Sequence, residues 1–209
     1  MDQITSSERS RELMVRGRDK YYAAKPFLMF AASIFRMLPA AVARFLWEWL
    51  VWVPGTSGVA LRYVLAKRLA ASLGDNVYLG ELITVRGWEN IRIGSNVSIH
   101  RGCYIDASGG VTIGDEVSVA HATSILSFEH SWSDPGRSIR DNDLILKPVV
   151  IERDVWIGCG VRVLAGVHLG PRTVVAAGAV VTRSHPGGAL MAGIPARVVR
   201  SIVTTSEAG

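Results

Sequence analysis

The chain has 209 residues, of which 49% are hydrophobic and 20% charged, so it can bury a substantial core and is too apolar to be disordered throughout. Its two cysteines, Cys103 and Cys159, lie far apart in the sequence, which excludes a disulfide framework and a zinc knuckle. The net charge of +5 arises in residues 1–72, where eleven Lys/Arg accompany five Asp/Glu. Because this basic third is also apolar, we expect an anionic lipid surface and no nucleic acid as its partner.

Residues 1–72 are predicted to form a basic, apolar helical segment. Residues 27–53 have helical spacing in two pieces separated near Pro39, and a basic helix is expected over residues 59–72. The second piece has an apolar stripe, and three tryptophans of the kind that favour the membrane–water boundary lie within it: the stripe is Val42, Phe45, Leu46, Trp49, Leu50 and Val53, and the tryptophans are Trp47, Trp49 and Trp52.

We interpret residues 26–70 as an in-plane amphipathic anchor, because charged residues interrupt the apolar run before it is long enough to span a bilayer. The alternative is a helical cap that covers the first repeat and packs against a neighbouring subunit, since apolar helical stripes usually contact protein.

An aliphatic residue returns at every sixth position along most of residues 73–186, which matches neither a helix nor an ordinary strand. This spacing predicts a mainly β solenoid of triangular coils, with one short strand on each side. Near-copies begin at Leu73, Ile93 and Ile113, and two extra residues enter one corner of these coils. The aliphatic positions predict about five coils: Leu73, Leu79, Val85, Ile93, Ile99, Ile105, Ile113, Val119, Ile125, Ile151, Ile157, Val163, Leu169, Val175 and Val181.

The position four residues after an aliphatic is also predicted to point inward and holds a side chain of modest size. Cys103 is one of these residues, so we expect it to be a buried filler and not a nucleophile. The full set is Val77, Val97, Cys103, Val117, Thr123, Val155, Val161 and Ala179.

The six-residue spacing is lost in a long loop at about 126–149, and an interruption of that length inside a domain is usually functional. Its segment SFEHSWSDP resembles the active-site segment of sugar O-acetyltransferases in the hexapeptide-repeat acyltransferase family. The later runs VWIG, AAGAVVTR and AGIPARVVR resemble the closing coils of its galactoside-type branch, and the resemblance covers about two-thirds of the chain. It implies a left-handed parallel β-helix.

The resemblance further implies transfer of an acetyl group from acetyl-CoA to a sugar hydroxyl, with His130 as the general base. An imidazole with an ordinary pKa of about 6.5 can accept and return the hydroxyl proton. A carboxylate on the other ring nitrogen would fix the tautomer, and Asp134 and Glu129 are both candidates. His100 stands where galactoside-type enzymes commonly have Asn, and it is expected to contact the acceptor or the thioester carbonyl. The remaining histidines are expected at the surface or at corners: His121, His168 and His185.

The same resemblance implies an acetyl-CoA site in the closing coils. Trp156 would line the acyl end, and the backbone N–H of Cys159 would face the developing oxyanion. Ala177 and Gly178 would leave room for the pantetheine arm. The nucleotide phosphates would be contacted by Thr182, Arg183 and Arg197, with Arg200 in support.

In this family the acyl-CoA tunnel runs between adjacent chains, so a homotrimer is expected. The expected organisation is a helical segment over 1–72, the β-helix over 73–186 and a tail over 187–209 that closes the coenzyme site. The expected acceptor is a lipid-linked glycan precursor of a surface polysaccharide. The protein would then lie in the cytoplasm, peripherally on the inner face of the membrane, and would require no metal.

Three alternatives remain at this point. The acceptor can be the amine of a nucleotide amino sugar or another small molecule. A γ-carbonic-anhydrase-like hydratase would need three converging histidines, for which His100, His121 and His130 are the candidates. A non-catalytic scaffold would retain the coil without the reaction.

Overall fold

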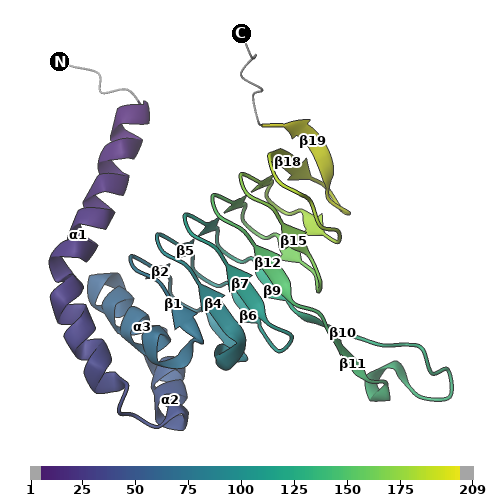
Figure 1. Cartoon of the computed structure of the whole chain (residues 1–209), viewed down its shortest axis with the longest axis horizontal. Coiled ribbons are helices and arrows are strands. Elements are labelled where there is room, and N and C mark those ends of the chain that lie inside the picture. The colour runs from purple at the N-terminus through teal and green to yellow at the C-terminus, as the bar shows by residue number, and fades with distance from the viewer. Residues whose placement is uncertain (1–5, 203–209) are drawn as a thin grey trace.

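The computed structural model describes the backbone of residues 6–202 and the side chains of residues 18–202. Three helices cover the N-terminal end of a β-solenoid, and a two-stranded hairpin projects from its side (Figure 1). The helices are α1 (Ser6–Phe35), α2 (Ala40–Leu50) and α3 (Gly55–Leu69).

The solenoid has three sheets, one on each side of the coil, which we label A, B and C. Sheet A contains β1 (Ser72–Leu73), β4 (Ile91–Ile93), β7 (Val111–Ile113), β12 (Val149–Ile151) and β15 (His168–Leu169). Sheet B contains β2 (Tyr78–Leu79), β5 (Ser98–Ile99), β8 (Ser118–Val119), β13 (Trp156–Ile157), β16 (Val174–Val175), β18 (Ala189–Ala192) and the antiparallel β19 (Arg197–Ser201). Sheet C contains β3 (Thr84–Arg86), β6 (Tyr104–Asp106), β9 (Ser124–Leu126), β14 (Arg162–Val163) and β17 (Val180–Val181). The hairpin is formed by β10 (Phe128–His130) and β11 (Leu144–Leu146).

The strand register confirms the predicted coil. Leu73 pairs with Ile93 and Ile93 with Ile113, at the twenty-residue spacing of the near-copies. Ile113 pairs with Ile151, across the hairpin, and Ile151 with Leu169. Six parallel strands in sheet B make about six turns, one more than the repeat predicts, because β18 adds a strand after the last hexad.

The core is made of the aliphatic and position-four residues that the spacing identifies. All of them are buried except Val85, which is half-buried. Cys103 is 1% exposed, its thiol donates to the Ala120 carbonyl, and burial raises the pKa of the thiol. The prediction that Cys103 is a core filler is therefore confirmed.

The two extra corner residues of the first coil contribute a side chain that joins the solenoid to the helices. Trp88 lies in a short 3-10 turn (Trp88–Asn90), and its indole is buried edge-to-face against Trp47 with 4.8 Å between ring centroids. The expectation that Trp47 shares the membrane boundary with Trp49 and Trp52 is therefore wrong. An indole in the corner gives α2 an apolar partner within the protein.

The basic residues of α3 also face protein. The Arg62 side chain is fully buried and donates to the Leu79 and Val53 carbonyls at 2.7 and 2.6 Å, and burial lowers the pKa of its guanidinium. The next residue of α3 is Tyr63, and its hydroxyl lies 2.9 Å from that of Tyr21, which ties α1 to α3. The helix α3 is therefore a cap over the first coil, so for this part of residues 26–70 the alternative of a helical cap describes the structure and the anchor interpretation does not.

The stripe predicted for the second helical piece is divided between two environments. Val42, Phe45 and Trp49 are exposed, whereas the other three stripe residues are half-buried: Leu46, Leu50 and Val53. The core contact is made instead by the face that carries Ala43, Trp47 and Val51. No helix in the part of the chain that the structure describes is long and apolar enough to cross a bilayer.

Candidate active site

The segment that interrupts the repeat is an ordered hairpin and not a structureless loop. In its stem Phe128 pairs with Leu146 and His130 with Leu144. Near its tip the buried side-chain amide of Asn142 accepts from the Asp134 N–H at 3.1 Å and donates to the Ser138 carbonyl at 3.0 Å. This amide satisfies polar backbone groups on several sides of the turn, so the tip has one preferred conformation.

Polar groups fix the base of the hairpin on the solenoid. The buried Ser127 hydroxyl donates to the Asp106 carbonyl at 2.7 Å and accepts from the Gly109 N–H at 2.8 Å. Further along the hairpin stem, Lys147, which follows β11, forms an ion pair with Glu129 of β10. These contacts hold β10, and therefore His130, in a defined direction.

His130 is exposed at the end of β10, with its ring 6.3 Å from that of Phe128. The two candidate orienting carboxylates have other partners, because Glu129 pairs with Lys147 and Asp134 accepts from the Gly136 N–H at 2.9 Å. Among the side chains of residues 18–202, none forms a hydrogen bond with the His130 ring. The orienting group therefore stays a prediction.

Three of the residues expected around the acyl-CoA, Cys159, Ala177 and Gly178, lie along the corner between sheets B and C, which we call the B–C edge. Cys159 occupies this corner in one coil, and Ala177 and Gly178 occupy it in the next. The backbone N–H groups of Cys159 and Ala177 donate to no other group among the described residues, so both can donate to a ligand.

Three glycines recur along the B–C edge at the same corner position: Gly102, Gly160 and Gly178. Their φ angles are +70°, +67° and +72°, in the left-handed region that glycine tolerates, and a Cβ built on any of them would meet no atom within 4 Å. The edge is therefore bare and open beside Cys159. Gly160 was not among the residues predicted from the sequence, although glycine recurs at this corner position in the sequence.

His100 and His121 lie lower on the B–C edge, in the two preceding coils. The His100 ring is 5.4 Å from that of Tyr78. Partial burial at the corner lowers the pKa of the His100 imidazole, and the neighbouring His121 lowers it further. His100 is therefore a neutral imidazole at neutral pH, able to donate from one nitrogen and accept at the other.

The candidate phosphate ligands are exposed near the C-terminal end of the solenoid. Thr182 and Arg183 follow β17, and Arg197 and Arg200 lie on β19. Trp156 lies on the outer face of sheet B and is 54% exposed. The groove around it is lined by Glu116, Ser118, Arg172 and Val174.

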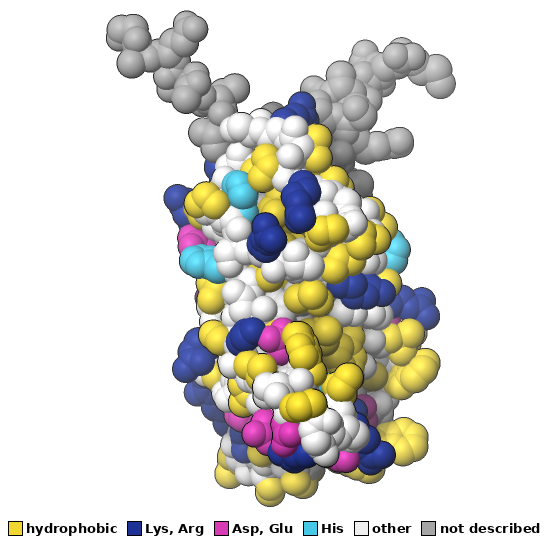
Figure 2. All heavy atoms as spheres, turned by 90° about the vertical axis from the view of Figure 1, so that its right-hand side faces the viewer, with side chains coloured by type: hydrophobic (Ala, Val, Ile, Leu, Met, Phe, Trp, Pro, Cys, Tyr) yellow, Lys and Arg dark blue, Asp and Glu magenta, His cyan; other side chains and the backbone are white. Residues whose placement is uncertain are grey.

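Within one chain, His130 does not meet the B–C edge. Strand β10 continues β9 away from the solenoid (Figure 1), so roughly 20 Å of extended chain, at about 3.3 Å per residue, separates Ser124 from His130. Figure 2 views the molecule from the side on which the hairpin projects, and both hydrophobic and charged side chains cover that side. The predicted site is therefore divided between two sides of sheet C.

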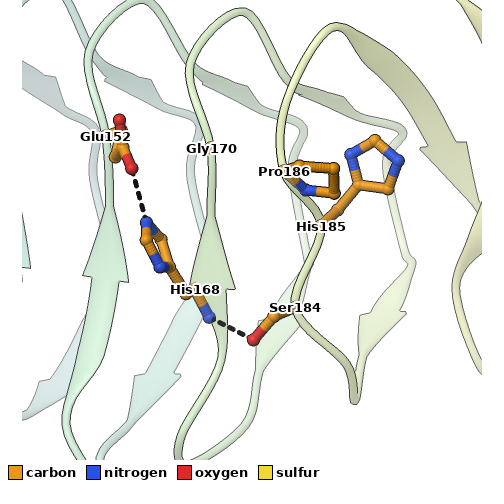
Figure 3. Close-up of a pocket in the computed structure, with 6 residues that line it drawn as sticks. All are labelled: Glu152, His168, Gly170, Ser184, His185 and Pro186. Atoms are coloured by element: carbon orange, nitrogen blue, oxygen red, sulfur yellow. Dashed lines mark hydrogen bonds and ion pairs between the residues drawn. The ribbon is translucent and has the colours of Figure 1, made fainter.

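A depression on sheet A contains two further histidines (Figure 3). His168 pairs with Glu152 at 2.6 Å, and its backbone N–H donates to the Ser184 hydroxyl at 2.9 Å, whereas His185 points away from this pair. Both histidines belong to the surface of sheet A. Nowhere between residues 18 and 202 do three or more His, Cys, Asp or Glu side chains gather as a metal site would require.

Comparison with known proteins agrees with this geometry. Residues 148–183 match the family model described as bacterial transferase hexapeptide (six repeats). The galactoside O-acetyltransferase of Escherichia coli strain K12 is 32% identical over 146 residues, which cover 70% of this chain and 71% of that protein.

Two solved structures are similar as well. A hexapeptide-repeat acetyltransferase from Vibrio cholerae O1 biovar eltor, complexed with acetyl coenzyme A, has a TM-score of 0.70 and 32% identity over 78% of this chain and 86% of that one. A galactoside acetyltransferase in complex with coenzyme A has a TM-score of 0.69 and 29% identity over 80% of this chain and 84% of that one. These similarities set aside the hydratase alternative. The chain belongs to the hexapeptide-repeat acetyltransferase family, in the branch of the galactoside O-acetyltransferases, and is an acetyltransferase.

Proposed function

We propose that the protein is a homotrimeric, acetyl-CoA-dependent sugar O-acetyltransferase, in which His130 of one subunit faces the B–C edge of its neighbour. The observation that carries this proposal is the separation of His130 from Cys159, Ala177 and Gly178 within one chain. A general base must lie within hydrogen-bond reach of the hydroxyl that it deprotonates. A second chain brings the two halves together without any change in the fold.

The B–C edge fits the elongated shape of acetyl-CoA. Arg197, which pairs with Ala192 near the C-terminal end of this edge, supplies a guanidinium group for the nucleotide phosphates, whereas Arg183 follows β17 on the other border of sheet C and would reach phosphates bound at a neighbouring chain. The corner at Ala177 and Gly178 accommodates the narrow pantetheine arm, since nothing larger than the Ala177 methyl group projects from it. The thioester then lies beside the free Cys159 N–H, and the acceptor lies beyond it, next to His100.

The chemistry follows from this order. The His130 imidazole accepts the proton of the acceptor hydroxyl as the hydroxyl oxygen attacks the thioester carbonyl and the new C–O bond forms. The Cys159 N–H donates to the oxyanion of the tetrahedral intermediate, and neutral His100 orients the acceptor. When the C–S bond breaks, the His130 imidazolium returns its proton to the departing sulfur. The products are the O-acetyl sugar and free coenzyme A.

The hairpin supports an assembly of several chains. Trp132 and Ile139 are 71% and 63% exposed in the single chain, and all three residues of β11 are exposed as well. A projecting two-stranded ribbon has little stability by itself, and a neighbouring subunit would cover these apolar side chains.

The setting that we propose is the assembly of a surface polysaccharide or glycolipid, with a lipid-linked glycan as the acceptor and the protein peripheral on the cytoplasmic face of the membrane. The basic, apolar N-terminal third supports this setting. Release of free thiol from acetyl-CoA, measured against a panel of sugars, nucleotide sugars and amino sugars, identifies the acceptor. Turnover with amines alone would replace O-acetylation by N-acetylation.

Complementation between two impaired variants, assayed at an acetyl-CoA concentration well below the raised KM of Ala177→Trp, tests the shared site. His130→Ala removes the base, and Ala177→Trp fills the exposed corner of the B–C edge. In trimers refolded from an equal mixture, about one quarter of the interfaces pair an intact base with an intact edge, so about one quarter of the wild-type activity should return.

The matched control mixes His130→Ala with the double variant His130→Ala/Ala177→Trp, which contains no intact base and should stay inactive. Ala71→Trp, at an exposed alanine near the first coil, controls for the added indole and should retain activity. If the first mixture stays as inactive as its components, the shared site is refuted.

A further inference from the structure

Helices α1 and α2 each expose a second apolar stripe, on the side opposite their contact with the core. The two stripes have the same spacing of three, four and three residues, and their members are between 41% and 85% exposed. They are Phe27, Phe30, Ile34 and Met37 from α1 and the turn after it, and Val42, Phe45, Trp49 and Trp52 from α2 and the turn after it. We call these eight residues the docking face.

The docking face is additional to the packing that holds the helices in place. Leu28 and Ala32 of α1 and Trp47 of α2 are already buried on the inner side. A helix that needs only one apolar side to fold has no structural use for a second. The stripes meet at the turn around Pro39, and hydrophobic side chains line the bottom edge of Figure 2, where Figure 1 places α2.

We propose that the docking face inserts into the interfacial region of an anionic lipid bilayer. Five of its eight residues are aromatic, the composition of side chains that settle at the membrane–water boundary. Most of the eight Lys/Arg in residues 18–72 face protein or pair with solenoid carboxylates, but two stay exposed without a carboxylate partner among residues 18–202 and can attract negative headgroups. Lys20 and Arg36 are exposed beside it. The helices lie in the membrane plane, since no helix between residues 6 and 202 is suited to span it.

This inference deepens the membrane setting of the proposed function and adds an orientation. The first coil separates the helices from the coils of His100 and His121, and the coil of Ala177 lies further still from the helices. With the docking face on the bilayer, the histidine-bearing half of the B–C edge lies nearer to the lipid. The arginine-bearing end extends into water, where acetyl-CoA is dissolved. An acceptor attached to a lipid would therefore approach from the correct side.

The test is sedimentation of the full-length protein with vesicles of phosphatidylcholine, with or without phosphatidylglycerol. Trp49→Ser/Trp52→Ser should weaken partition by about tenfold or more, because two large apolar side chains no longer enter the interface. The matched control, Val198→Ser/Val199→Ser, removes two exposed hydrophobic side chains of β19 and should bind as the wild type does. Lys20→Gln/Arg36→Gln should weaken binding to phosphatidylglycerol vesicles alone, by roughly fivefold for each charge.

The catalytic proposal is read out separately, as acetyl-CoA turnover with a soluble acceptor, which should be unchanged in Trp49→Ser/Trp52→Ser. If the wild type binds vesicles but shows no acetyl-CoA turnover, the proposed reaction is refuted and the proposal of the docking face is unaffected. Unaltered sedimentation of Trp49→Ser/Trp52→Ser would overturn the docking face. The docking face would also be refuted if the wild type did not bind vesicles but formed assemblies that this variant cannot form. The eight residues would then join copies of the chain.

Discussion

Sheet C is bordered by two edges of different construction. On the B–C edge the chain turns within a few residues in every coil, and beside Cys159 the corner is bare backbone. On the opposite edge, residues 127–148 leave the solenoid altogether and carry His130 outward on a stem held by polar contacts. The first edge has a shape suited to a long, thin co-substrate and the second carries a base, and neither edge alone contains a complete site.

The largest effect should come from the base. His130→Ala should lower kcat by about 10²- to 10⁴-fold, the contribution of a positioned general base, because the hairpin contains no second histidine. Steady-state thiol release measures the loss. Thermal unfolding should be unchanged, since the side chain is exposed. Residual activity within a few-fold of the wild type would remove His130 from the mechanism and with it the functional difference between the edges.

A large side chain on the B–C edge should change the KM for acetyl-CoA and not kcat. Ala177→Trp should raise the KM for acetyl-CoA by about tenfold or more, since an indole would occupy the space of the pantetheine arm and one or more contacts worth about 1.4 kcal/mol each would be lost. Direct binding of coenzyme A by calorimetry should weaken in parallel. An unchanged affinity would show that the co-substrate does not use this edge.

The stem of the hairpin offers a smaller test. Lys147→Met keeps the apolar reach of the side chain and removes the ion pair with Glu129. An exposed pair contributes up to about 1 kcal/mol, so we expect kcat to fall by no more than about fivefold, through poorer placement of His130. The KM for acetyl-CoA should stay constant. A change in that KM with kcat unaffected would mean that the ion pair serves the coenzyme and not the base.

The smallest expected effect is the pH dependence that His100 gives to the free energy of unfolding. Burial and His121 lower the pKa of His100, so the unfolded chain takes up a proton at a higher pH than the folded chain does. The contribution of His100 to stability should therefore decrease as the pH falls below about 6.5. Proton NMR of the imidazole should give a pKa below that of a free histidine, and His100→Gln should flatten this part of the stability profile. A pKa at or above the free value would contradict the assignment of a neutral imidazole.

Much of the solenoid could be predicted because its determinants are local and repeated. Ile99, Val119 and Ile157 each need only a hexad to point inward, and the coil above and the coil below supply the same environment. The strand register and the role of Cys103 followed from the same rule. The sixth turn did not, because Met191 in β18 pairs with Val175 without a hexad of its own.

The helices and the candidate site were less predictable, since their contacts join residues distant in the sequence. Trp47 was expected at a membrane boundary and is buried instead, because nothing near it in the sequence indicates that Trp88 will face it. A basic helix was expected over residues 59–72, but its sequence does not indicate that the carbonyls of Leu79 and Val53 bind Arg62 in the interior. The sequence singled out His130 and Cys159, but it did not show that one chain keeps them apart.

The amino-acid sequence by itself determined the coil and its family, because a six-residue period places each inward side chain without reference to distant parts of the chain. Tertiary structure decided which side of α1 and α2 stays exposed and which edge of sheet C each site residue occupies. Both depend on side chains that meet only after the chain has folded: Trp47 on Trp88, Tyr21 on Tyr63, and Ser127 on the backbone of Asp106. A local sequence period does not indicate which distant side chains will contact each other. The functional consequences of these contacts are therefore seen only in the folded chain.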